Sequence, residues 1–175
     1  FSEKSALHIP NDYMTYGGIS RGVVLEHIAG AYIEYIHGTP KRSVRGWDLM
    51  LTARICNPEP ETKTYRLMLE AKGLGAAGED IRLGAGETAE YSRTISVGEV
   101  REWAPESPVL YDISALLLEG GKPVDDLIDR VGFRQVEIRG KDILLNGKRL
   151  RIKGFCRHED HPQFCCALSL GAIAQ

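Results

Sequence analysis

Apolar and polar residues alternate along short stretches between about residues 31 and 133. In the stretch 47–55 every second residue is apolar and falls on one side of an extended chain: Leu49, Leu51, Ala53 and Ile55. Residues 65–71 repeat this alternation. Because successive side chains of a strand point to opposite faces, each stretch predicts a strand with one buried face.

Further strands are expected at 31–36, 81–83, 87–97, 109–118 and 124–133. Turn-forming residues separate them at 57–60, 84–86 and 120–121, and no stretch has a helical period. About seven strands in roughly 100 residues predict an all-β, immunoglobulin-like β-sandwich. Cys56 has no partner cysteine on a later strand, so the intersheet disulfide of antibody domains is excluded.

A hairpin is expected after the sandwich, because Asn146-Gly147 separates two apolar-bearing segments within 142–153. Asn and Gly tolerate positive φ at both central positions of a tight turn. The second strand should run to Lys153, so that the following segment emerges at a strand end. That segment, 154–162, holds the densest potential chemistry of the chain, with Arg157, His158, Glu159 and Asp160 in succession.

Charge and composition exclude several functions. The chain has 22 basic and 24 acidic residues and a net charge of −2, which favours neither nucleic acid nor an anionic membrane. Arg149, Arg151 and Lys153 alternate along one predicted strand face, but no aromatic residues interleave with them, so an ion-paired or solvated face is expected. No apolar run approaches the ~20 residues that cross a bilayer.

A zinc site is the alternative interpretation of the C-terminal cysteines and histidines. The ligand types are present, but paired C-x-x-C spacing is missing from the set Cys156, His158, His161, Cys165 and Cys166. We therefore predict no metal and no cofactor, and reduced thiols.

Five ordered segments resemble family 2 glycoside hydrolases, which include β-galactosidases and β-glucuronidases. They are Tyr16–Leu25, Trp103–Tyr111, Arg130–Glu137, Leu145–Lys148 and Gly154–Pro162. The resemblance departs from the family pattern at three positions, where Gly22 replaces proline, Cys156 replaces asparagine and Cys165 replaces glycine.

The resemblance implies three domain pieces. Residues 1–25 would be the tail of a jelly-roll sugar-binding domain, 26–131 the immunoglobulin-like sandwich, and 132–175 the truncated start of a (β/α)8 TIM barrel. It also implies an exo-acting, retaining β-glycosidase with a carbohydrate substrate and a homo-oligomeric assembly. The catalytic glutamates of the family lie on later barrel strands, so no catalytic residue is expected in this chain.

Within 154–162 the resemblance assigns sugar contacts to His158 and Asp160, and loop support to Arg157 and Glu159. Glu159 and Asp160 are not the catalytic pair, because neighbours in an extended segment point to opposite sides. Residues 1–5 lack the order of a secretory signal, which predicts a cytoplasmic location.

Two further expectations bear on function. Trp103 and Tyr111 are expected to pack in the core of the sandwich and not to form a sugar platform. The rival to an enzyme is a non-catalytic β-sandwich module that mediates contacts between domains or subunits.

Overall fold

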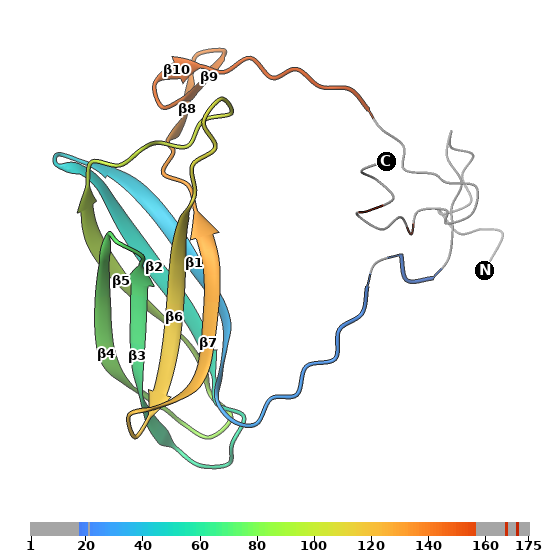
Figure 1. Cartoon of the computed structure of the whole chain (residues 1–175), viewed down its shortest axis with the longest axis vertical. Helices are drawn as coiled ribbons and strands as arrows, with labels where there is room; N and C mark the ends of the chain where they lie inside the picture. The colour runs from blue at the N-terminus through green and yellow to red at the C-terminus, as the bar shows by residue number, and fades with distance from the viewer. Residues whose placement is uncertain (1–17, 21, 157–166, 168–170, 172–175) are drawn as a thin grey trace. The chain divides into compact units, whose positions relative to one another are not determined.

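A computed structural model describes residues 18–20, 22–156, 167 and 171 (Figure 1). Residues Ile28–Arg151 form one compact unit, and the described residues outside this range belong to a second unit. All the strands assigned in the described part of the chain lie in the first unit.

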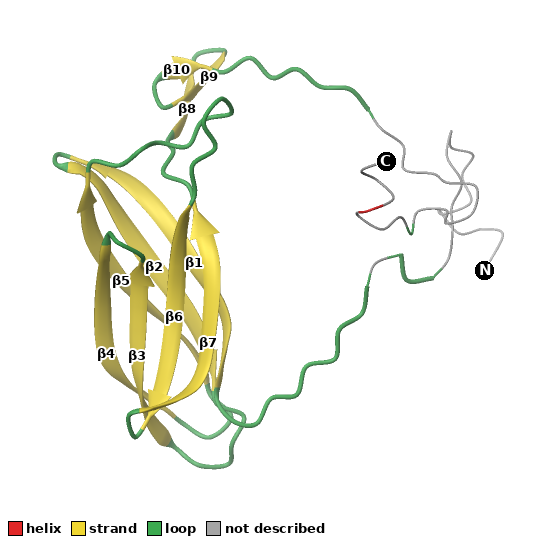
Figure 2. Cartoon of the chain, in the orientation of Figure 1, coloured by secondary structure: helices red, strands yellow, loops and turns green. Residues whose placement is uncertain are grey.

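Seven antiparallel strands build two layers of a sandwich (Figure 2). The first sheet has the order β1-β2-β5, with bounds Tyr32–Ser43, Gly46–Cys56 and Thr88–Gly98. The second has the order β4-β3-β6-β7, with bounds Gly75–Leu83, Lys63–Ala71, Tyr111–Glu119 and Lys122–Val131. The predicted immunoglobulin-like sandwich is confirmed, but β4 pairs with β3, whereas the fourth strand of constant-type immunoglobulin domains pairs with the fifth.

The core lies between the two sheets and follows the predicted alternation. The inward residues of β2 are fully buried: Leu49, Leu51, Ala53 and Ile55. Facing strands contribute Leu67, Leu69, Ile113 and Leu117, each at most 1% exposed. Removal of this apolar area from water is the main favourable term for the fold.

Two strands are longer than their sequence patterns predict. β1 continues to Ser43, because its polar second half pairs with β2 down to Ser43 and Gly46. β4 begins at Gly75, in a Gly- and Ala-rich stretch with no visible alternation. Gly78 leaves room there for Met68 on the neighbouring strand, whose Sδ would lie 2.4 Å from an added Cβ and would have to move.

The predicted Asn-Gly hairpin forms a third, smaller sheet with the order β10-β9-β8. Its strands are β8 (Val136–Arg139), β9 (Asp142–Leu145) and β10 (Lys148–Arg149). Asn146 and Gly147 have φ values of 52° and 77°, as the turn requires. The prediction that the last strand reaches Lys153 was wrong, because β9 offers only four residues for pairing and the ladder ends after Leu150 N–H donates to the Ile143 carbonyl.

In the second unit, the predicted jelly-roll tail ends in the apolar run Val23–Leu25. These residues have no strand assignment, and their side chains are exposed. No helix among the described residues has the length and apolarity needed to span a membrane.

Candidate functional site

The four residues to which the sequence assigned sugar binding and loop support lie outside the described residues: Arg157, His158, Glu159 and Asp160. Of the alternative zinc ligands only Cys156 is described, and it is exposed with a free thiol. Among the described residues, no three His, Cys, Asp or Glu side chains gather as a metal ion would need. The roles of these residues therefore stay predictions.

The chain that leads to this segment leaves the sandwich at Phe133, just beyond β7. Phe133 is fully buried and makes edge-on contacts with Trp47, at 5.7 Å between ring centroids, and with Tyr111, at 5.3 Å. Such geometry places the positive ring edge against a negative face and adds to the burial of apolar area. Phe133 therefore fixes the exit of the chain to the sandwich core.

A loop beside this exit carries Trp103, which is half-buried. The backbone N–H of Trp103 donates to the Phe133 carbonyl at 2.9 Å. The Arg134 guanidinium lies 5.0 Å from the centre of the Trp103 indole ring. Gly132 lies against the same residue, since an added Cβ would be 3.0 Å from the Trp103 Cβ. Tyr111 packs against the sandwich core as predicted. Trp103 is half-buried in the loop and is not part of that core, and Pro105 and Pro108 of the same loop are exposed.

Asn146 connects the hairpin to this loop through both ends of its side-chain amide. Its Oδ1 accepts from the Gln135 N–H at 2.9 Å, and its Nδ2 donates to the Trp103 carbonyl at 3.0 Å. The Asn146 backbone N–H also donates to the Gln135 carbonyl at 2.8 Å. The turn residue is thus also a cross-link between the hairpin, the exit segment and the Trp103 loop.

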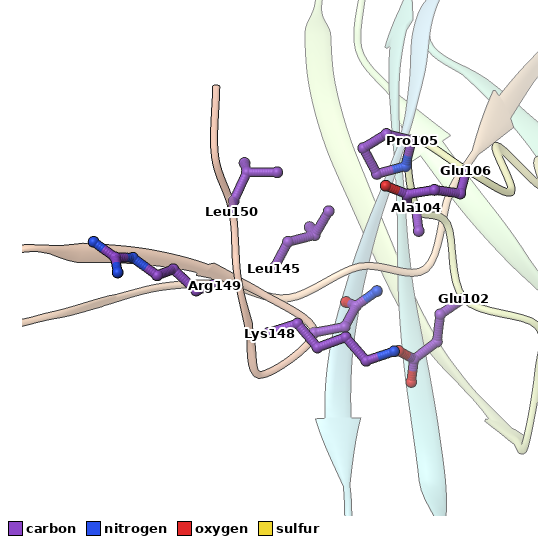
Figure 3. Close-up of a pocket in the computed structure, with 9 residues that line it drawn as sticks. Glu102, Ala104, Pro105, Glu106, Leu145, Lys148, Arg149 and Leu150 are labelled. Carbon is purple, nitrogen blue, oxygen red and sulfur yellow. The ribbon is translucent and has the colours of Figure 1, made fainter. Parts of the chain in front are cut away.

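A hollow of about 610 Å³ separates the loop from the hairpin (Figure 3). Ala104 and Pro105 form one apolar wall, and Leu145 and Leu150 form the facing one. Charged residues rim it, with acidic groups from the loop and basic groups from the hairpin: Glu102, Glu106, Lys148 and Arg149. Apolar walls with a rim of both charges suit a protein segment better than a sugar ring. None of the described residues that line the hollow is aromatic, so they offer no ring face on which a sugar could stack.

Two of the four rim charges, Glu102 and Arg149, take part in ion pairs. Arg42 pairs with Glu102 and stacks over Trp47 at 4.6 Å from the ring centre. The guanidinium of Arg149 pairs with Asp142 at 2.8 Å, on the hairpin face that also carries the pair Arg139–Glu137. The expected ion-paired face is confirmed for Arg149.

Residues 31–134, most of the sandwich, match the family model described as glycosyl hydrolases family 2. The chain belongs to this family. Membership agrees with the resemblance of the five sequence segments. The family model ends just beyond the buried exit residue Phe133.

Solved family 2 structures resemble the chain over nearly its whole length. A β-galacturonidase from Eisenbergiella tayi, solved with galacturonate bound, is 47% identical with a TM-score of 0.89, covering 99% of this chain and 31% of that one. A β-glucuronidase from Bacteroides uniformis is 26% identical with a TM-score of 0.72, covering 92% of this chain and 21% of that one. A curated β-glucuronidase from Paenibacillus borealis is 32% identical over 151 residues, which are 86% of this chain and 24% of the relative. The chain thus spans less than a third of each family 2 relative named here.

The cross-link made by the Asn146 side chain was missed in the sequence. Asn-Gly was interpreted only as a signal for a turn, which accounts for the backbone conformation and assigns no partner to the Asn146 side-chain amide. Asn also provides a donor and an acceptor, which Gly or Asp at the same turn position would not both provide.

Proposed function

We propose that this chain is the sandwich portion of a family 2 glycoside hydrolase that removes terminal sugars from β-glycosides, with uronides as the preferred substrates. One observation carries the choice of sugar: the 47% identity to a β-galacturonidase extends over 99% of this chain. The curated β-glucuronidase relative supports the same class, because glucuronate and galacturonate both carry a carboxylate.

The proposed mechanism is hydrolysis with retention of anomeric configuration. Retaining glycosidases use two carboxyl groups ~5 to 5.5 Å apart, one as acid/base and one as nucleophile. Glu159 and Asp160 are adjacent in sequence and cannot both face one glycosidic bond if the segment is extended. We therefore assign the catalytic carboxylates to a part of the enzyme outside this chain.

His158 is proposed to contact a sugar hydroxyl, with Asp160 beside it in the same subsite. An imidazole can donate or accept a hydrogen bond that strengthens as the oxocarbenium-like transition state forms. Arg157 and Glu159 would then hold the loop by ion pairing.

The proposal is tested with the full-length enzyme and three aryl substrates, the β-galacturonide, the β-glucuronide and the β-galactoside. We expect kcat/KM for at least one uronide to exceed that for the galactoside by on the order of 10² or more, since a site built for a carboxylate leaves charged groups unpaired without it. Proton NMR of the first-formed sugar should show the β anomer. A galactoside preference would overturn the assignment of uronides, and an α product would overturn retention.

A second candidate function is contact between domains or subunits. The hairpin face that carries Val136, Ile138 and Ile143 favours it, because these side chains are 60%, 81% and 39% exposed. An apolar cluster with charged pairs only on the opposite face is typical of a contact surface. Sedimentation of the full-length protein with Ile138→Lys tests it, and a subunit contact predicts a smaller assembly than the wild type.

A further inference from the structure

The geometry points to the Asn146 side chain as a latch that fixes the β8–β10 hairpin to the sandwich and so positions the chain that continues into 157–162. The latch comprises Asn146, Gln135 and Trp103. Its positioning role rests on the proposed function, whereas its mechanical role rests on the contacts of residues 28–151 alone.

The sandwich side of the latch is held firmly. Ala104 and Ser107 exchange two backbone hydrogen bonds, at 3.1 and 2.9 Å, which close the loop after Trp103. Before Trp103, the Arg101 N–H donates to the Tyr111 hydroxyl at 3.1 Å. The Trp103 carbonyl is therefore presented to Asn146 by a loop that is tied on both sides.

On the hairpin side, the Asn146 side-chain amide contacts the Trp103 loop, and the backbone hydrogen bond from the Asn146 N–H to the Gln135 carbonyl lies beside it. Asn146 is the only residue in the described part of the chain with positive φ other than glycine, and its side chain bridges Gln135 and Trp103 from that position. Leu150, where the hairpin ladder ends, is only four positions after Asn146 in the sequence. A change in the angle of the hairpin therefore moves the start of the following segment.

Two substitutions separate the side chain from the turn. Asn146→Gly keeps a residue suited to φ of 52° but removes both side-chain hydrogen bonds. Asn146→Asp keeps the acceptor for Gln135 but replaces the donor to the Trp103 carbonyl with a carboxylate oxygen at pH 7. Near pH 3, about one unit below the ordinary pKa of aspartate, the introduced carboxyl is largely protonated and can donate again.

Residual dipolar couplings of backbone amides in the 175-residue chain provide the mechanical readout. We expect one alignment tensor to fit both the sandwich and the hairpin in the wild type at pH 7 and pH 3. Asn146→Gly should require two tensors at both pH values, and Asn146→Asp should require two at pH 7 and one at pH 3. Gly147→Asn is the matched control, because it places an amide in the same turn at φ of 77° and should leave one tensor.

The same substitutions in the full-length enzyme test positioning. Asn146→Gly should lower kcat by about tenfold with KM changed less than twofold, the size of effect that the loss of one or two hydrogen bonds produces. A wild type that needs two tensors, or an Asn146→Gly chain that needs one, overturns the latch. Unchanged kcat in Asn146→Gly overturns the role of Asn146 in positioning the following segment. The number of tensors still decides whether the side chain fixes the hairpin to the sandwich. A wild-type enzyme without glycosidase activity overturns the proposed function, and the positioning role with it.

Discussion

Replacing Phe133 with alanine tests whether the exit from the sandwich is part of its core. The ring is fully buried and contacts Trp47 and Tyr111 edge-on. Phe→Ala substitutions in cores cost ~3 to 5 kcal/mol, from lost transfer free energy and the cavity that remains. The two aromatic contacts place this site toward the upper end, because each pair adds ~0.5 to 1.5 kcal/mol beyond area burial.

Urea unfolding of the 175-residue chain measures the effect. Tryptophan fluorescence reports on the core directly, because Trp47 is 1% exposed and contacts Phe133. Phe155→Ala is the matched control, since that ring is 91% exposed and its loss should change the free energy of unfolding by less than ~0.5 kcal/mol. A loss below ~1 kcal/mol for Phe133→Ala would show that the exit segment packs on the sandwich without supporting it.

Two other substitutions test a buried polar side chain and the loss of stability at alkaline pH. Asn57→Ala should lower the free energy of unfolding by ~2 to 4 kcal/mol, because Nδ2 donates at 2.9 Å to the carbonyls of both Glu61 and Gly84, and each carbonyl would lose this partner. Urea unfolding measures this loss, and Thr94→Ala on the exposed outer face is the control that should leave stability unchanged. The pKa of Tyr65 is raised above 10.0, chiefly by burial. Its neutral hydroxyl therefore favours folding below the unfolded pKa, and this contribution is lost as the pH rises through the folded pKa. Unfolding measured from pH 8 to above pH 10 should show a smaller alkaline loss of stability in Tyr65→Phe, and identical curves would contradict the assignment.

The sandwich could be predicted where burial leaves a period in the sequence. β2 and β3 each have one buried and one more exposed face, so their alternation identified them. The second half of β1 and most of β4 carry polar, Gly or Ala residues where a buried strand would carry large apolar ones. They are strands because β1 pairs with β2 and β4 pairs with β3. Pairing is a tertiary property that a local pattern does not encode.

The junction was predictable only in part. Asn146-Gly147 identified the turn, because positive φ restricts the residue type. The partner of the Asn146 amide lies 43 positions away at Trp103, and no local signal specifies it. The end of β10 at Arg149 was missed for a similar reason, since strand length depends on how far the partner strand extends.

We propose that the catalytic carboxylates of the glycosidase lie outside this chain. Turnover of an aryl β-galacturonide and an aryl β-glucuronide should be compared for the purified 175-residue chain and for the full-length enzyme, at equal molar concentration. We expect release of the aryl group by the full-length enzyme and none above buffer by the chain. Turnover by the chain that persists through repurification, or no turnover of either uronide by the full-length enzyme, would contradict it.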